Sequence, residues 1–525
     1  MSVPGSLKVW PFWASLIGGA LHALSLSPWC AQMGHLAPPL LQTLALLILL
    51  ASLARQSGPR GAALACWVYG TVWLLGATGW MFVSLHDFGG LPAWMAVVAV
   101  ALLCAALSLY LAWAGWAWGR WRTGVIGVDA GLFGALWLPA ELARALVFTG
   151  FPWGASGYGL LDTPLRHFAP WLGVYGMGWV WATLCAWVLW SANAARERRL
   201  SRWAPLGLVV VLTTVGAWWS GVSYTREVGQ PLRVTLLQGN VPQDEKFSPE
   251  RQVEMLVWHA RQLLAARGDL VVAPETAIPL LPSQLPEAYW SQIQSAFERD
   301  GRHALIGVPL GDFTVGYTNS VAGLSSDTAR LPGQMYRYDK HHLVPFGEFI
   351  PTGFRWFVRM MNIPLGDFSR GPLAAPSFEV KGQRVAPNIC YEDLFGEEIA
   401  ARFVQADRAP TILANVSNLA WFGESVAIHQ HLQIARLRSL EFQLPTIRAT
   451  NTGATVVINH QGEVTAALAS NMRGSLQADV QGMSGVTPYA WWAGRWGLWP
   501  LIGLGLLWVG ASAIWGQRRA EGAGI

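Results

Sequence analysis

The residue in this sequence best suited to covalent chemistry is one cysteine, Cys390, at the end of an apolar segment. It follows a strand predicted over Arg384–Ile389 and precedes Tyr391-Glu392-Asp393. Nucleophiles are commonly presented at such strand-end turns. No other cysteine lies between Leu232 and Val480, so no disulfide can form within that region. The position fits either a thiol nucleophile or a buried, inert cysteine, which is a frequent core residue.

A thiol nucleophile needs a base and a group that stabilises the oxyanion. Glu275 lies just past a short apolar strand, in Pro274-Glu275-Thr276, where a carboxylate can have a raised pKa. Lys340 is a lone cation in a mainly apolar segment. Taken singly, each is also consistent with a surface charge. Together with Cys390 they supply base, cation and nucleophile, but only the fold can bring them together.

Histidine is the alternative base. His429 and His431 are two apart on a predicted helix, so they do not share a face, and this spacing also fits a metal site poorly. His341 and His342 are more plausible, although they directly follow Lys340. The spacing of these residues therefore does not decide whether a histidine or Glu275 is the base.

These residues fall in a region that alternates strands with helices. Strands are predicted over Leu232–Leu237, Leu270–Ala273, His303–Val308, Thr318–Leu324, Met335–Tyr338, Arg384–Ile389, Thr411–Val416, Thr446–Val457 and Glu463–Ala467. Helices are predicted over Pro249–Arg267, Glu287–Arg299 and Ser425–Phe442. Such alternation indicates an α/β sandwich, and about 250 residues is enough for one core.

The whole chain has a composition that excludes a simple cytosolic enzyme. Of its 525 residues 53% are hydrophobic and only 13% are charged, against about 25% charged in ordinary soluble domains. The net charge of +5 does not indicate nucleic-acid binding, because the arginines form short clusters between apolar runs. We therefore expect a polytopic membrane protein with one inserted soluble domain and no nucleic-acid partner.

Eight stretches have the length and apolarity of a membrane span, which needs roughly 20 residues. They are Val9–Leu24, Leu36–Leu53, Ala62–Leu85, Leu91–Trp118, Val125–Phe148, Phe168–Trp190, Ala204–Val222 and Ala490–Trp515. The predicted organisation is seven transmembrane helices in residues 1–228, a catalytic domain in 229–482, and an eighth helix with the C-terminus in 483–525.

Arginines in the loops predict the orientation. They follow the second, fourth, sixth and eighth spans, whereas the intervening short loops are poor in Lys and Arg. The positive-inside rule therefore places both termini in the cytoplasm. An odd number of spans before the soluble domain then places that domain outside, which in a bacterial inner membrane means the periplasm.

Glu141 and Arg144 lie three residues apart within the fifth predicted span. A charge inside a membrane suggests a function by default. A pair at this spacing can also satisfy itself, and that is the interpretation we favour here.

Three motifs resemble the catalytic set of the nitrilase, or carbon–nitrogen hydrolase, superfamily. They are Glu275 in Pro-Glu-Thr, Lys340 in Tyr-Asp-Lys before Leu-Val-Pro-Phe-Gly-Glu, and Cys390 in Ile-Cys-Tyr-Glu-Asp, in that order. This resemblance covers about Arg233 to Asp479. Seven spans before such a domain and one after it resemble the bacterial apolipoprotein N-acyltransferase family. Further segments similar to that family are Phe148–Trp153, Gln238–Asn240, Gly347–Pro351 and His429–Arg436.

The resemblance implies an αββα sandwich and a two-step acyl transfer through a thioester on Cys390. A membrane phospholipid would be the acyl donor, and the N-terminal S-diacylglyceryl-cysteine of an apolipoprotein the acceptor, in the last step of lipoprotein maturation. Glu275 is implied as the base and Lys340 as the oxyanion stabiliser. No metal and no cofactor is expected, and a monomer is the default expectation.

The resemblance also implies supporting residues. Glu348 would orient Lys340 and keep it charged, while Tyr391 and Glu392 would support the nucleophile loop. The substrate-binding candidates are Phe247, Trp421 and Phe422. For the last two, plain core packing is the alternative.

Two other functions compete with this interpretation. A membrane-tethered nitrilase-type amidase would use the same three residues and pass the thioester to water. A transporter with an inactive external domain is a different class, but the spans contain one conspicuous charged pair and no evident inverted repeat. An intact Glu-Lys-Cys set also argues against the transporter.

Overall fold

The computed structural model describes residues 5–196, 221–243, 248–326, 335–358 and 368–522. The chain divides into two compact units. The first, called the helical unit below, comprises residues 1–82, 92–222 and 498–525. The second, called the α/β unit, comprises residues 83–91 and 223–497.

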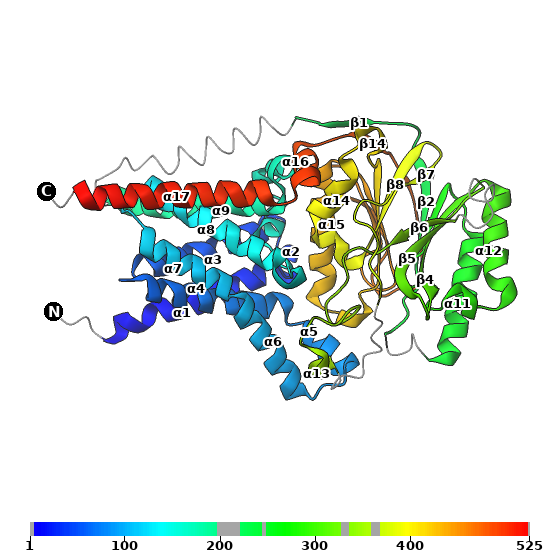
Figure 1. The fold of residues 1–525 in the computed structure, drawn as a ribbon, viewed down its shortest axis with the longest axis horizontal. Coiled ribbons are helices and arrows are strands. Elements are labelled where there is room, and N and C mark those ends of the chain that lie inside the picture. The colour runs from blue at the N-terminus through cyan, green and yellow to red at the C-terminus, as the bar shows by residue number, and fades with distance from the viewer. Residues whose placement is uncertain (1–4, 197–220, 244–247, 327–334, 359–367, 523–525) are drawn as a thin grey trace. The chain divides into compact units, whose positions relative to one another are not determined.

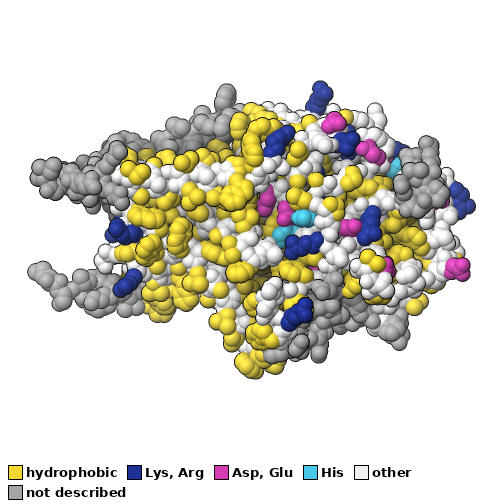
Figure 2. Space-filling view, in the orientation of Figure 1, with side chains coloured by type: hydrophobic (Ala, Val, Ile, Leu, Met, Phe, Trp, Pro, Cys, Tyr) yellow, Lys and Arg dark blue, Asp and Glu magenta, His cyan; other side chains and the backbone are white. Residues whose placement is uncertain are grey.

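The helical unit consists of apolar helices that run alongside one another (Figure 1). Its principal helices are α1 (Gly5–Ser25), α2 (Pro28–Gln32), α3 (Ala37–Ala54), α4 (Pro59–Thr78), α6 (Ala93–Leu107), α7 (Leu109–Trp121), α8 (Ile126–Leu146), α9 (Ala169–Arg196) and α17 (Trp499–Gly522). Helix α1 packs on α3 and α4, and α8 packs on α9 and α17. Apolar side chains also cover much of the visible outer face (Figure 2), and Trp94 and Leu507 are about 70% exposed. An apolar exterior of this kind suits a lipid environment.

Five helices among the described residues are long and apolar enough to cross a membrane. They cover Ala37–Ala54, Pro59–Thr78, Ala93–Trp121, Ile126–Thr149 and Pro164–Ala192. These correspond to the second through sixth predicted spans. The first predicted span is a helix, α1, but is not among the five. The seventh, Ala204–Val222, lies almost wholly outside the described residues.

The eighth predicted span, Ala490–Trp515, contains a break, although its two helices together are long and apolar enough to cross a membrane. Helix α16 (Pro488–Trp496) ends just before Gly497, and α17 begins at Trp499. Gly497 between them has φ of +55°, a conformation that ends a right-handed helix and that glycine adopts without steric cost. The third predicted span is also shorter than expected, because α4 ends at Thr78 and not at Leu85.

Glu141 and Arg144 are both buried in α8, with 3.6 Å between Arg144 Nη2 and Glu141 Oε1. The Glu141 carboxylate also accepts hydrogen bonds from the backbone and hydroxyl of Ser156, at 2.8 and 3.0 Å. Arg144 Nη1 donates to the carbonyl of Trp153 at 3.0 Å. The pair thus has partners within the helical unit, in accord with a structural role.

The α/β unit contains two six-stranded sheets within its described part. The order of one is β13-β2-β3-β4-β5-β6, and that of the other is β12-β11-β10-β9-β8-β7. Their strands are β2 (Leu232–Gln238), β3 (Leu270–Val272), β4 (His303–Asp312), β5 (Gly316–Leu324), β6 (Tyr336–Asp339), β7 (Phe378–Val380), β8 (Gln383–Ile389), β9 (Ile412–Ser417), β10 (Thr446–Thr450), β11 (Val456–Ile458), β12 (Val464–Ala467) and β13 (Gly474–Val480). A short ribbon pairs β1 (Thr225–Glu227) with β14 (Met483–Gly485).

The two sheets pack face to face, and helices cover their outer faces (Figure 1). Helices α11 (Pro249–Ala265) and α12 (Glu287–Asp300) lie on the first sheet, and α14 (Gly396–Ala400) and α15 (Val426–Phe442) lie beside the second. Strand β3 shows how the sequence dictates this layering. Leu270 and Val272 join the core between the sheets, whereas Val271 joins the core under α11 and α12. A strand buried on both faces reads as a continuous apolar run, and the resulting order of layers is αββα.

Parallel pairing brings several strand ends to the same edges of the sheets. Strands β2, β3 and β4 are parallel neighbours, as are β8, β9 and β10. In such sheets ligands bind beyond the carboxyl ends of the strands. Glu275 follows one of these ends, that of β3, and Cys390 follows that of β8.

Candidate active site

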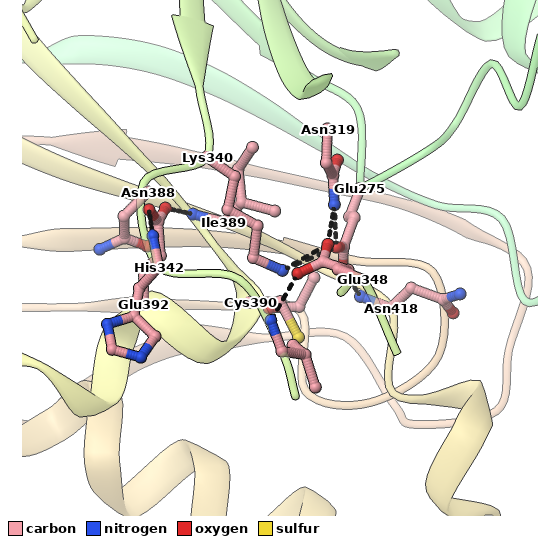
Figure 3. Close-up of polar contacts among 12 residues, drawn as sticks. Glu275, Asn319, Lys340, His342, Glu348, Asn388, Ile389, Cys390, Glu392 and Asn418 are labelled. Atoms are coloured by element: carbon pink, nitrogen blue, oxygen red, sulfur yellow. Dashed lines mark hydrogen bonds and ion pairs between the residues drawn. The ribbon is translucent and has the colours of Figure 1, made fainter. Parts of the chain in front are cut away.

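The three predicted catalytic residues come from three loops that converge (Figure 3). Glu275 follows β3 and Lys340 follows β6, both in the first sheet, whereas Cys390 follows β8 in the second sheet. All three are buried, with 8%, 1% and 8% of their surface exposed. The sheets' face-to-face packing therefore assembles what the sequence spreads over more than 100 residues.

Glu275 lies on a turn that passes close over β4. A Cβ atom on Gly307 would lie 2.2 Å from the carbonyl oxygen of Pro274, so only glycine leaves room for the turn. Glu275 Oε1 accepts a hydrogen bond from Asn319 Nδ2 at 2.7 Å. Its Oε2 accepts one from the backbone N–H of Asn418 at 2.9 Å. The carboxylate is thus held by a donor from each sheet.

Lys340 is a buried ammonium between two carboxylates. Its Nζ donates to Glu348 Oε1 at 2.9 Å and lies 3.4 Å from Glu275 Oε1. Asn319 Nδ2 bridges the same two carboxylates, at 2.7 Å from each. Burial works against the charge on Lys340, but Glu348 and Glu275 outweigh it and raise its pKa above the ordinary value. Lys340 therefore supplies a fixed positive charge at neutral pH.

Cys390 begins a 3₁₀ helix over Cys390–Leu394 with φ of +52°, which is uncommon for a residue other than glycine. Burial, followed by the charge of Glu275, raises the pKa of its thiol from 9.0 to about 12, while Lys340 acts in the opposite direction. The resting thiol is therefore protonated at neutral pH. A thiolate forms here only if a base removes the proton, and Glu275, whose charge raises the pKa of this thiol, is the predicted base.

Glu348 and Glu392 hold the loops that carry these groups. Glu348 Oε2 accepts a hydrogen bond from the backbone of Val344 at 2.8 Å, while its other oxygen binds Lys340. The Glu392 carboxylate accepts four hydrogen bonds of 2.7 to 3.1 Å. The donors are the backbone N–H groups of His341, His342 and Ile389 and the hydroxyl of Tyr338. Glu392 thus ties the loop after Lys340 to the loop that begins at Cys390.

Tyr391 is buried and packs its ring near Phe395, with 5.3 Å between the ring centroids. Phe422 packs against the core between the sheets. The ring of Trp421 makes an edge contact with Phe88, and the backbone carbonyl of Trp421 accepts a hydrogen bond of 2.6 Å from the Ser84 hydroxyl. Phe247 lies outside the described residues. The lipid-binding roles of these aromatic residues stay predictions.

The histidines occupy other positions. His341 Nδ1 lies 2.8 Å from the carbonyl of Gly371, and His342 Nδ1 lies 2.8 Å from Glu398 Oε1. His431 Nε2 lies 3.2 Å from the backbone carbonyl oxygen of Cys390. The choice of Glu275 over a histidine as the base stays a prediction. Within the described part of the chain, no group of three His, Cys, Asp or Glu side chains could hold a metal ion.

Two asparagines that contact Glu275 were not predicted from the sequence. Asn319 lies inside the predicted strand Thr318–Leu324, and Asn418 follows β9, just beyond the predicted strand Thr411–Val416. Asn418 Oδ1 also accepts a hydrogen bond from Asn451 Nδ2, which follows β10, at 2.9 Å. The sequence did offer one signal: Asn418 and Asn451 are both asparagines that directly follow an apolar strand.

Residues 233–489 match the family model described as carbon–nitrogen hydrolase. Together with the αββα layers and the Glu-Lys-Cys cluster, this match defines the α/β unit as a carbon–nitrogen hydrolase domain. A solved carbon–nitrogen hydrolase from Helicobacter pylori G27 is 18% identical, with a TM-score of 0.33, over 52% of this chain and 94% of that chain.

Residues 18–187 match the model described as the apolipoprotein N-acyltransferase N-terminal domain. Curated relatives with the name apolipoprotein N-acyltransferase match nearly the whole chain. The protein from Verminephrobacter eiseniae is 46% identical over 93% of each chain. That from Ralstonia nicotianae is 45% identical over 96% of this chain and 93% of its own. The chain belongs to the apolipoprotein N-acyltransferase family, a family of membrane enzymes.

Proposed function

We propose that Cys390, Glu275 and Lys340 transfer an acyl chain from a membrane phospholipid to the α-amine of an N-terminal S-diacylglyceryl-cysteine on an apolipoprotein. One observation carries the assignment of these residues. In a family of acyltransferases, the buried Cys390 thiol converges with the Glu275 carboxylate and the buried Lys340 ammonium, whose Nζ lies 3.4 Å from Glu275 Oε1 (Figure 3). That set supplies nucleophile, base and oxyanion stabiliser in one place.

In the first step Glu275 takes the proton of the Cys390 thiol as the sulfur attacks the carbonyl carbon of a phospholipid ester. The carbonyl oxygen gains negative charge, which Lys340 and backbone N–H groups stabilise. The C–O bond then breaks, and Glu275 returns the proton to the leaving alkoxide. A lysophospholipid departs, and the acyl chain stays on Cys390 as a thioester.

In the second step the acceptor amine attacks the thioester carbon, and Glu275 takes a proton from the attacking nitrogen. The C–S bond breaks, and the sulfur regains a proton to restore the resting thiol. The product is an amide, which is more stable than either ester. The exchange therefore needs no ATP, and each residue returns to its starting protonation state.

The helical unit supports a role at a membrane surface. Moving an acyl chain from a bilayer into water costs about 0.8 kcal/mol per CH₂, so an enzyme with two lipid substrates gains by working at the bilayer. We assign eight spans, with residues 1–228 before the catalytic domain of 229–482 and 483–525 after it. The arginine clusters support an inner-membrane location, with both termini in the cytoplasm and the catalytic domain in the periplasm.

Aromatic side chains in the loop after β9 are suited to bind the acyl chains of lipid substrates. Trp421 is half-buried beside Phe88, on the α/β unit's segment Val83–Leu91. Phe422, in the same loop after β9, is also half-buried. We assign Trp421 and Phe422 to binding of acyl chains, and we give Phe247, which lies outside the described residues, the same role from the family resemblance alone.

The test is a two-substrate assay with purified full-length protein in phospholipid vesicles. The vesicles carry a phospholipid with an isotopically labelled sn-1 acyl chain, and the acceptor is an S-diacylglyceryl-cysteinyl peptide. Mass spectrometry should find the label as an amide on the peptide's α-amine. The same peptide with an acetylated N-terminus and a Cys390→Ala enzyme serve as controls, and neither should give labelled peptide. Release of label as free fatty acid, at one rate with or without the peptide, would instead identify a hydrolase.

A further inference from the structure

A buried row of side chains connects β10 to the backbone of Cys390. Arg448 in β10, His431 in α15 and Asp393 in the 3₁₀ helix each have 1% of their surface exposed or less. Arg448 Nη1 donates to Asp393 Oδ2 at 2.6 Å. Its Nη2 lies 2.7 Å from His431 Nδ1, and His431 Nε2 lies 3.2 Å from the carbonyl oxygen of Cys390. The acyl-transfer mechanism above does not use these groups.

The chemistry of arginine decides which ring nitrogen of His431 carries the proton. A guanidinium only donates hydrogen bonds, so Nδ1 of His431 must accept from Arg448. Burial, followed by the charge of Arg448, lowers the pKa of His431 well below its usual value, and the ring is therefore neutral. A neutral ring with an unprotonated Nδ1 carries its hydrogen on Nε2. That N–H points at the Cys390 carbonyl and donates to it.

The carbonyl of Cys390 belongs to the peptide group whose nitrogen is that of Tyr391. Because a peptide group is planar and trans, fixing the direction of its C=O also fixes the opposite direction of its N–H. Asn415 Nδ2 approaches the same carbonyl oxygen at 3.4 Å from β9. The backbone at Cys390 has an uncommon φ of +52°. Donors on its carbonyl from two packed elements therefore determine the orientation of both the cysteine and the Tyr391 N–H.

We propose that His431, held as the Nε2–H tautomer by Arg448, is a positioning residue that aims the Tyr391 N–H as an oxyanion donor. This inference rests on the proposed function, since the oxyanion is that of the acyl transfer. His431 touches neither substrate nor the reacting atoms. It acts through the Cys390–Tyr391 peptide.

Two substitutions separate the contacts of His431. His431→Asn has a side-chain oxygen near the position of Nδ1, so it can still accept from Arg448, but its amide is too short to reach Cys390. His431→Gln has an amide N–H near the position of Nε2 and can still donate to the Cys390 carbonyl. His460→Asn, in the turn between β11 and β12, is the matched control.

Two rates are measured on Cys390 in each full-length variant. The first is acylation by vesicle phospholipid, and the second is alkylation by iodoacetamide, which passes through no oxyanion. His431→Asn should lower the maximal acylation rate about 100-fold, the size of effect seen when an oxyanion donor is lost. The phospholipid KM and the alkylation rate should change less than threefold. His431→Gln should return acylation to within about tenfold of the parent protein.

Wild-type acylation in His431→Asn would overturn the proposal, as would an equal loss of both rates in both variants, which would indicate only a structural role. If His431→Asn does not fold, ¹⁵N NMR of histidine-labelled wild-type protein provides the test. It should show the Nε2–H tautomer of one buried histidine, unchanged from pH 6 to pH 8.5, and Arg448→Met, which lacks the donor to Nδ1, should remove that signal. An Nδ1–H tautomer or an imidazolium at His431 would overturn it. Absence of acylation in the wild-type protein would contradict the proposed function and leave the tautomer measurement standing.

Discussion

The protonation state of resting Cys390 is the electrostatic feature of the site that is most open to measurement. Burial and the Glu275 carboxylate raise the pKa of the thiol from 9.0 to about 12. Three pKa units correspond to about 4 kcal/mol against the thiolate. At pH 8 the thiolate fraction is therefore about 10⁻⁴, against about 10⁻¹ for an ordinary thiol of pKa 9.

The assay follows the pseudo-first-order alkylation of Cys390 by iodoacetamide from pH 6.5 to 9.5, read by mass spectrometry of its peptide. The other four cysteines are free and buried, so the Cys390 peptide is quantified separately. Because the thiolate is the nucleophile, the rate should rise tenfold per pH unit with no plateau. The dependence on pH, and not the absolute rate, carries the test, since access also affects the rate.

Glu275→Gln makes the same experiment sharper, because it should move two rates in opposite directions. Removal of the carboxylate charge lowers the pKa of the thiol, so alkylation at pH 8 should rise about tenfold or more. Acylation by phospholipid should fall at least 100-fold, because the base is lost. Glu287→Gln, an exposed change on α12, should alter neither rate. A wild-type plateau with a midpoint near pH 7 would refute the reasoning, because it would reveal a preformed thiolate paired with Lys340.

Three further substitutions test how the site is supported. Glu348→Gln should lower the acyl-transfer rate about tenfold or more without unfolding the domain, because Lys340 loses the carboxylate that it contacts at 2.9 Å. Gly307→Ala should nearly abolish transfer, because its Cβ would lie 2.2 Å from a carbonyl oxygen in the turn that carries Glu275, the proposed base. Glu392→Gln should destabilise the protein by about 2–3 kcal/mol, since an amide nitrogen would then face N–H or O–H donors; thermal unfolding should show a lower Tm.

Each of these expectations has a matched control or a contrary outcome. Gly474→Ala, where the nearest atom would lie 3.7 Å from the new Cβ, should be silent. Transfer at the parent rate in Gly307→Ala would mean that the turn position does not matter. An unchanged Tm in Glu392→Gln would mean that the four hydrogen bonds do not hold the two loops together, and full activity of Glu348→Gln would remove its role beside Lys340.

The sequence predicted much of the α/β layering because the buried strands are short apolar runs. Leu270–Val272 and Ile412–Ser417 were recognisable for that reason. The prediction of one strand over Thr446–Val457 is wrong, because the chain turns between β10 and β11. Asn451 in that turn binds Val241 and Asn418, a constraint from distant residues that local apolarity cannot reveal. Strand β13 was missed because only every second residue is buried or half-buried.

The convergence of the site could not be derived from spacing. Glu275 and Lys340 belong to one sheet and Cys390 to the other, so their approach depends on how two sheets pack. The resemblance to a family predicted Glu275, Lys340 and Cys390 as one set. The structure adds the residues that hydrogen-bond to them, such as Asn319 and Glu348. The roles of Asn319 and Arg448 could not be predicted, because the sequence of a strand does not show which buried group a polar side chain will hydrogen-bond.

The most direct test of the central claim is to observe the acyl-enzyme itself. Purified protein is mixed with vesicles of a phospholipid whose acyl chain is defined, without acceptor, and is then quenched in acid for intact-mass analysis. The mass should rise by one acyl group, tandem fragmentation should locate that group on Cys390, and hydroxylamine or an S-diacylglyceryl-cysteinyl peptide should remove it. An acyl group on any other residue, or a product amide formed by protein whose Cys390 never becomes acylated, would contradict the account.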